Sequence, residues 1–277
     1  MDTKELSACL ENVRANVPLV HCITNYVTVN DCANALLGCG GSPIMSDEPE
    51  DVADITSICG GLVLNIGTLN RRSIEGMRVA GARAAELSHP IVVDPVGAGA
   101  SALRTATAGE LIDHLPVTVV RGNMSEIKAV AGAAAATRGV DVNPDDAVTE
   151  GNLAASAAFA RGLAAKLGCV VAITGAIDIV ASAERAVAVR NGVAMMGKVT
   201  GAGCMLSCLV GAYVVANPAD ALAATVAAIA GEGLAGEVAY GRMGELDGNG
   251  SFRTYLLDAI CNMDAAQLAA GAKVEEL

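Results

Sequence analysis

A glycine-rich segment directly before a strongly apolar stretch is the first part of this sequence that could do chemistry. It reads Thr200-Gly201-Ala202-Gly203-Cys204, and it begins a predicted helix. Glycines let the backbone turn so that several N–H groups point the same way, and the helix dipole adds partial positive charge there. In a phosphotransferase, such an anion hole would stabilise the phosphoryl group during transfer. A flexible helix entry without a ligand is the alternative that this pattern leaves open.

The thiol of Cys204 would lie in the first turn of this helix. A helix N-terminus lowers the pKa of a thiol, whereas a nearby phosphate would raise it again. Cys204 is therefore either a weak general base toward an alcohol or a buried thiol. We expect Cys208, one turn later, to serve in packing.

Three charged residues follow predicted strands. Asp94 precedes Pro95 and two glycines, where a carboxylate suits Mg²⁺ bound mainly through water, although a turn or N-cap is an equal alternative. Glu126 either caps a helix beginning near Asn123 or holds Mg²⁺ beside Asp94. Arg121 is a candidate to bind ATP phosphates in so acidic a chain, with a surface ion pair as the alternative.

Other patterns are weaker. Residues 192–198 have the spacing of a phosphate-binding P-loop, but Val199 stands where Ser or Thr is required. Residues 97–102 contain only two of the three glycines of a dinucleotide fingerprint. The three histidines, His21, His89 and His114, are too far apart to form a metal motif.

Short β-branched runs alternate with helical patterns through most of the chain. The runs are residues 62–66, 91–93, 117–120 and 170–173, and near-continuous apolar runs suit strands covered on both faces. The alternation predicts a mainly parallel α/β sheet, whose ligands bind beyond the carboxyl ends of the strands. A hairpin around residues 183–184 and a helical tail follow, and we expect residues 1–277 to form one domain.

Composition limits the classes of partner. The net charge of −12 leaves no basic field for nucleic acid or anionic lipid, so neither is expected. The odd number of cysteines, nine, and a charged N-terminus favour a cytoplasmic protein without disulfides. The longest strongly apolar stretch, residues 204–216, is too short to span a membrane. A redox protein is disfavoured because the sequence has no C-x-x-C pair.

Taken together and in order, these segments resemble the hydroxyethylthiazole kinases of thiamin salvage. The resemblance extends from about residue 17 to residue 215. It rests on residues 18–30 (PLVHCITNYVTVN), 42–45 (SPIM), 93–98 (VDPVGA), 121–127 (RGNMSEI), 174–175 (TG) and 200–204 (TGAGC). The first and last of these segments are together the most specific.

The resemblance implies a ribokinase-like fold, with a mainly parallel central sheet and helices on both faces. It implies phosphorylation of the primary hydroxyl of 4-methyl-5-(2-hydroxyethyl)thiazole by ATP with Mg²⁺, in a homotrimer whose active sites lie near subunit interfaces. By position, it implies the following roles: Met45, Gly201 and Asn25 for the thiazole, Arg121 and Thr174 for ATP, Asp94 and Glu126 for Mg²⁺, and Cys204 for catalysis.

Cys204 departs from the wider superfamily, which has Asp at this position. The second hypothesis is a related kinase that acts on a hydroxymethylpyrimidine or pyridoxal-type alcohol. Such kinases usually have Asp where this sequence has Cys204, so the thiol argues against this hypothesis. A non-catalytic binding protein with the same fold is the third. The phosphate-side residues Arg121, Glu126 and 201–204 argue against that hypothesis. The loop at 137–148 resembles a variable region of the family, and we assign it no role.

Overall fold

The computed structural model describes residues 1–132 and 147–277, and in these ranges nine strands form one sheet. The strand order is β2-β1-β3-β4-β5-β6-β7-β8-β9. The first six strands in this order pair in parallel, and the last three join by antiparallel pairing. Their bounds are β1 Leu19–Ile23, β2 Ser42–Ile44, β3 Gly61–Asn65, β4 Ile91–Asp94, β5 Val119–Asn123, β6 Val170–Thr174, β7 Asp178–Ala181, β8 Ala186–Val189 and β9 Val274–Glu276.

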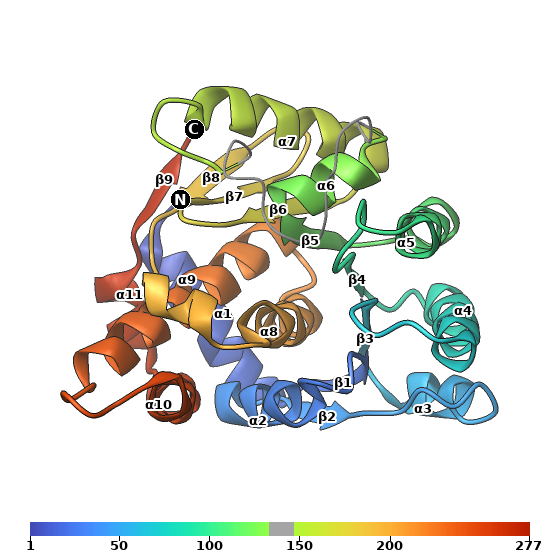
Figure 1. Ribbon diagram of the computed structural model, residues 1–277, viewed down its shortest axis with the longest axis horizontal. Coiled ribbons are helices and arrows are strands. Elements are labelled where there is room, and N and C mark those ends of the chain that lie inside the picture. The colour runs from blue at the N-terminus through green and yellow to red at the C-terminus, as the bar shows by residue number, and fades with distance from the viewer. Residues whose placement is uncertain (133–146) are drawn as a thin grey trace.

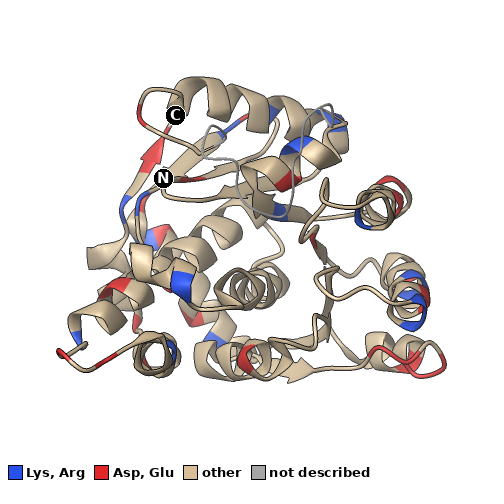
Figure 2. Cartoon of the chain, in the orientation of Figure 1, with Lys and Arg blue, Asp and Glu red and all other residues tan. Residues whose placement is uncertain are grey.

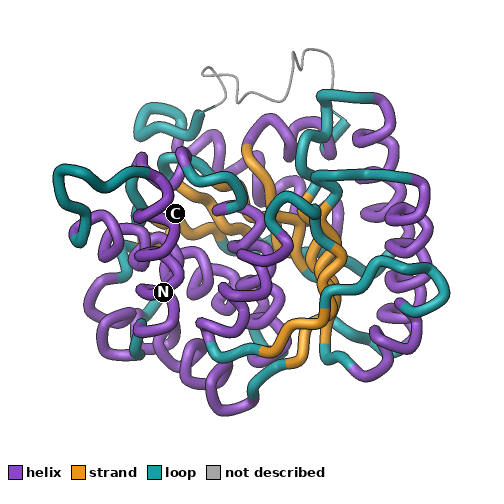
Figure 3. The backbone as a smooth tube through the Cα atoms, turned by 60° about the horizontal axis from the view of Figure 1, so that its bottom comes forward, coloured by secondary structure: helices purple, strands orange, loops and turns teal. Residues whose placement is uncertain are grey.

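Helices cover both faces of this sheet, which confirms the predicted fold class (Figure 1). On one face lie α1 Thr3–Asn16, α2 Val29–Cys39, α8 Ala202–Ala216, α9 Ala221–Gly241, α10 Asn249–Asn262 and α11 Ala265–Gly271. On the other lie α3 Val52–Ile58, α4 Arg71–Glu86, α5 Ala102–His114, α6 Met124–Val130 and α7 Leu153–Leu167. Figure 3 shows the strands enclosed between these two layers.

Every residue of β3, β4, β7 and β8 is buried, because side chains alternate between two hydrophobic cores. In β3, for example, Val63 faces the α8 side, whereas Leu62 and Leu64 face the α4 side. The four strands predicted from continuous apolar runs and the predicted hairpin are confirmed within a few residues. The sequence analysis did not predict β1, nor did it predict β2 and β9, which are edge strands of three residues each.

Helix α8 packs against β1, β3 and β4 and carries no charged residue, as Figure 2 shows. Gly201 occupies its N-cap with a φ of 94°, a left-handed conformation that favours glycine. A Cβ at this position would lie 2.5 Å from Cγ2 of Thr28, so the close approach of residues 28 and 201 also requires glycine. No side chain among the described residues caps the helix, and the N–H of Ala202 donates instead to the backbone carbonyl of Val199 at 3.4 Å.

Helix α9 is the one described helix long and apolar enough to cross a membrane. It corrects the expectation that residues 204–216 are the longest apolar stretch. The window that meets the criterion is 78% buried inside the protein, where α9 packs against α8 and α10. It is therefore a core helix, built from small residues that allow close helix packing.

Candidate active site

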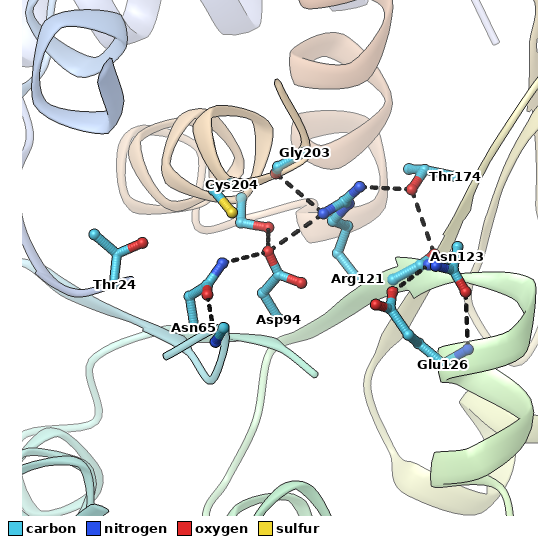
Figure 4. A network of polar contacts seen from close by, with 12 residues as sticks. Thr24, Asn65, Asp94, Arg121, Asn123, Glu126, Thr174, Gly203 and Cys204 are labelled. Atoms are coloured by element: carbon cyan, nitrogen blue, oxygen red, sulfur yellow. Dashed lines mark hydrogen bonds and ion pairs between the residues drawn. The ribbon is translucent and has the colours of Figure 1, made fainter. Parts of the chain in front are cut away.

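Arg121 is the centre of a polar cluster at the carboxyl ends of the parallel strands (Figure 4). Its side chain is buried, extends from the third of the five residues of β5 and donates three hydrogen bonds. Nη1 donates to the carbonyl oxygen of Gly203 at 3.0 Å and to Oδ2 of Asp94 at 3.3 Å. Nη2 donates to Oγ1 of Thr174 at 2.7 Å. The guanidinium thus links three strands to the first turn of α8, rather than forming a surface ion pair.

The carboxylate of Asp94 is fully buried at the end of β4, and its two oxygens differ. Oδ2 accepts hydrogen bonds from Nδ2 of Asn65 at 2.7 Å and Oγ of Ser207 at 2.8 Å, besides the bond from Arg121. Oδ1 has no hydrogen-bond partner among the described residues. Burial raises the pKa of Asp94 to about 6, although the charge of Arg121 acts in the opposite direction.

Glu126 caps helix α6 in the structure. Its Oε2 accepts from the backbone N–H of Asn123 at 2.8 Å, while Oδ1 of Asn123 accepts from the N–H of Glu126 at 2.9 Å. This reciprocal pair is the capping box that the sequence allowed as one alternative. Oε1 accepts from the N–H of Gly97 at 2.9 Å, so Glu126 also ties the loop after Asp94 to α6.

The two carboxylates fit a magnesium ion held mostly through water. Oδ1 of Asp94 is a hard oxygen ligand with no hydrogen-bond partner in the described part of the chain, and each oxygen of Glu126 has a second lone pair besides the one that accepts from a backbone N–H. In the described ranges no group of three or more His, Cys, Asp or Glu side chains could hold a metal by itself. The remaining ligands would therefore be water and substrate phosphate, as is usual for Mg²⁺.

Cys204 lies in the first turn of α8, half-buried, and Nδ2 of Asn25 donates to its Sγ at 2.9 Å. The pKa of Cys204 is raised to about 11 by burial first and by the negative charge of Asp94 second. The helix N-terminus does not produce a thiolate here, because desolvation outweighs the helix dipole. At neutral pH the residue is a thiol.

The other residues expected at the thiazole lie around this thiol. Oδ1 of Asn25 accepts from Oγ1 of Thr28 at 3.0 Å, which orients its amide nitrogen toward Cys204. Gly201 contacts the same threonine. Met45 directly follows β2 and packs partly buried on the hydrophobic core that Cys204 also contacts.

His21 is fully buried behind the Met45 segment. Its Nε2 lies 2.9 Å from the carbonyl oxygen of Ser46, and its Nδ1 lies 2.9 Å from Oγ1 of Thr56. Because a carbonyl only accepts, Nε2 carries the proton and Nδ1 accepts from the threonine hydroxyl. Burial lowers the pKa of His21, which agrees with a neutral ring.

A cavity of about 500 Å³ opens beside Arg121. Its wall includes the first turn of α8, the turn after β6 at Thr174, and the segment before α8. A Cβ at Gly203 would lie 2.8 Å from Nη2 of Arg121, so glycine is required where the helix meets the guanidinium. Residues 194–198, part of the P-loop-like pattern, form a 3-10 helix on this wall and not the glycine turn of a P-loop.

The structure thus joins most of the predicted site residues into one continuous group. Two residues to which the sequence analysis assigned no role, Asn65 and Ser207, hold Asp94 in place. Asn65 stands at a strand end, which was a usable signal. Ser207 lies one helical turn after Gly203, within an apolar helix whose pattern indicated only packing.

The parallel sheet, the uncapped glycine turn of α8 and the buried Arg–Asp pair together define a kinase of the ribokinase-like class. A ribokinase-like superfamily protein from Enterococcus faecalis V583 has the same fold, with a TM-score of 0.63 at 10% identity, over 89% of this chain and 88% of that protein. At this identity the likeness shows the fold alone.

Closer relatives give the family. The model of the hydroxyethylthiazole kinase family matches residues 10–266. A hydroxyethylthiazole kinase of Clostridium acetobutylicum is 51% identical over 266 residues, which are 96% of this chain and 97% of the relative. The structure of a hydroxyethylthiazole kinase protein from Pyrococcus horikoshii OT3 superposes with a TM-score of 0.87 at 36% identity, covering 98% of each chain. This chain belongs to the hydroxyethylthiazole kinase family.

Proposed function

We propose that this protein transfers the γ-phosphoryl group of ATP to the primary hydroxyl of 4-methyl-5-(2-hydroxyethyl)thiazole, in thiamin biosynthesis or salvage. The kinase activity is inferred from membership of the family. The single structural observation that supports it best is the uncapped start of α8, where a buried arginine bonds the carbonyl oxygen of Gly203. Backbone N–H groups and a fixed cation then face the same space, as phosphoryl transfer requires.

ATP binds, in this proposal, along the cavity beside Arg121. Arg121 and Thr174 contact its phosphates, and both line the cavity. Because Arg121 is held by three protein oxygens, its guanidinium is positioned before ATP arrives. Such preorganisation stabilises developing charge without reorganisation during the reaction.

Asp94 and Glu126 hold Mg²⁺ through water and through the phosphates of ATP. The ion would neutralise negative charge on the phosphoryl oxygens as it develops. Oδ1 of Asp94, which has no donor among the described residues, supports this assignment. Glu126 contributes in addition by fixing the loop at Gly97.

The thiazole alcohol lies on the other side of the α8 N-terminus, against Met45, Gly201 and Asn25, with Cys204 at the reacting hydroxyl. A thiol whose pKa is about 11 is a poor base. In a loose, dissociative transition state the alcohol keeps its proton until late, so a strong base is unnecessary. We assign Cys204 to positioning the hydroxyl and not to full proton abstraction.

We further propose one domain over residues 1–277, a cytoplasmic location and a homotrimer with active sites near subunit interfaces. The acidic chain is expected to bind neither nucleic acid nor membranes. Exposed apolar side chains next to Asn25 support a subunit contact there, since Tyr26 and Val27 are 75% and 59% exposed.

A coupled assay of ADP release tests this function. Purified protein is given ATP and Mg²⁺ with either the thiazole alcohol or a hydroxymethylpyrimidine. Turnover with the thiazole and not with the pyrimidine is expected. Turnover with the pyrimidine alone would reassign the acceptor, while the absence of turnover together with a melting temperature raised by ATP would indicate a binding protein.

A further inference from the structure

Glu232 is a buried carboxyl group that the proposed mechanism does not use. It lies on α9, is only 4% exposed, and lines the cavity beside Arg121. Its Oε1 has no hydrogen-bond partner in the described part of the chain. A buried polar atom without a partner costs on the order of 1–3 kcal/mol, so a ligand group that pairs with it would recover this free energy.

The carboxyl is neutral at pH 7. Burial raises the pKa of Glu232 to about 8; the charge of Arg121 opposes this shift, and the charge of Asp178 adds to it. A neutral carboxyl presents one O–H donor beside one carbonyl acceptor. Its hydrogen-bonding pattern is then that of a glutamine amide.

The position of Glu232 in the cavity indicates which part of a nucleotide it meets. Arg121, Thr174 and Gly203 line the part of the cavity that the proposed function assigns to the phosphates. The wall near Glu232 combines the apolar side chains of Leu206 on α8 and Ile229 on α9 with the polar Asp178 and Asn191. A largely apolar cavity with a few polar groups suits a flat heteroaromatic base.

Two glycines hold this wall in place. A Cβ on Gly233 would lie 2.7 Å from Cβ of Asn191, and a Cβ on Gly236 would lie 2.5 Å from Sδ of Met196. Helix α9 therefore packs directly on the segment before α8, with Glu232 beside the contact. The carboxyl is on a rigid element, which a selective contact requires.

We propose that Glu232 selects the adenine base of the nucleotide. Its carbonyl oxygen accepts from the 6-amino group of adenine, and its O–H donates to the neighbouring ring nitrogen. Guanine presents two acceptors, N7 and O6, along the corresponding edge, and one of them would face the carbonyl oxygen. This inference rests on the proposed binding of ATP in the cavity, and does not depend on the identity of the alcohol.

Equilibrium binding tests it without reference to turnover. Calorimetry would give the Kd of Mg-ATP, Mg-GTP and Mg-2′-deoxy-ATP for the wild-type protein, Glu232→Gln and Glu232→Leu. We expect ATP to bind at least about tenfold more tightly than GTP, as one good bidentate pair gives about 1–3 kcal/mol of discrimination. Glu232→Gln should keep this ratio within about threefold, and Glu232→Leu should bring it close to one.

Two results would overturn the proposal. One is an unchanged ATP-to-GTP ratio in a folded Glu232→Leu protein. The other is a loss of discrimination against 2′-deoxy-ATP alone, which would assign the carboxyl to the ribose.

If Glu232→Leu does not fold, the test uses the wild-type protein with purine riboside triphosphate, a nucleotide that lacks the 6-amino group. It should bind the wild-type protein at least about fivefold more weakly than ATP, and equal binding would refute the proposal. ATP selectivity without phosphorylation of the thiazole would contradict the proposed function only.

Discussion

Arg121 and Asp94 form a buried ion pair between the adjacent strands β5 and β4, with Nη1 of the arginine 3.3 Å from Oδ2 of the aspartate. The same guanidinium bonds the backbone of α8 at Gly203 and the hydroxyl of Thr174. A change at this pair therefore affects both the sheet and the anion site. For this reason it is the most informative place to perturb.

Arg121→Lys should lower kcat/KM for ATP by about 100-fold. A lysine keeps the charge but cannot reach three acceptors in a fixed plane, and two charge-assisted hydrogen bonds are worth roughly 3 kcal/mol together. Thr174→Val is the matched control, because it removes one acceptor only and should cost about tenfold. Equal losses in the two variants, measured by steady-state kinetics, would contradict the central role of the guanidinium.

Cys204→Asp should keep kinase activity, and Cys204→Ala should lose only part of it. The thiol is protonated at neutral pH, so its loss removes positioning and not an essential base. Steady-state rates with the thiazole, with circular dichroism as the check of folding, decide between these roles. A folded Cys204→Ala protein without any activity would show that the thiol is essential.

Ser207→Ala should move the acid limb of the pH–rate profile to higher pH. Magnesium binding needs the ionised form of Asp94, so activity is lost as the pH falls through its pKa of about 6. Removing the donor from Ser207 disfavours the carboxylate and raises that pKa further. We expect a loss of about threefold or more at pH 6 and less than about twofold at pH 8. A uniform loss across this range would argue against the assignment.

The unfolding free energy of Glu232→Gln, relative to that of the wild-type protein, should be higher at pH 8 than at pH 5. The folded pKa of about 8 lies above the ordinary value of 4.5, so stability from this group is complete below pH 4.5 and is lost as the pH rises toward 8. Glutamine has no such dependence. The difference in unfolding free energy, measured in urea, should grow by up to about 3 kcal/mol between pH 5 and pH 8. A constant difference would show that Glu232 is ionised in the folded protein.

His21→Leu should raise the KM for the thiazole several-fold and change the KM for ATP little. The imidazole fixes the carbonyl of Ser46, directly after Met45, and leucine leaves that carbonyl unpaired. Thr56→Val is a milder control, since it removes only the donor to Nδ1. Parallel changes in both KM values would indicate general destabilisation and not positioning of Met45.

Much of the fold followed from the sequence because continuous β-branched runs and strand–helix alternation are local signals. Asp94, the last residue of β4, and Arg121, which follows the apolar part of β5, were identified for the same reason. Contacts between distant segments were not predictable. The bond from Ser207 to Asp94 joins residues 113 positions apart, and a serine in an apolar helix carries no sign of it. The raised pKa of Cys204 likewise depends on burial beneath other elements.

The hairpin was found from its pattern, but β9 was not. It is three residues long, pairs with β8 at the far edge and has no hydrophobic alternation of its own. Its position depends on tertiary contacts. The expected variable loop at 137–148 lies almost wholly outside the described residues.

The most direct test of the central claim is the identity of the product. The protein is incubated with ATP, Mg²⁺ and 4-methyl-5-(2-hydroxyethyl)thiazole, and the products are analysed by mass spectrometry and ³¹P NMR. We predict one phosphate monoester on the hydroxyethyl oxygen, formed in equal amount to ADP and absent in a folded Arg121→Ala protein. ADP formed without a phosphorylated thiazole, or the same ester formed without Arg121, would contradict the proposed function and site.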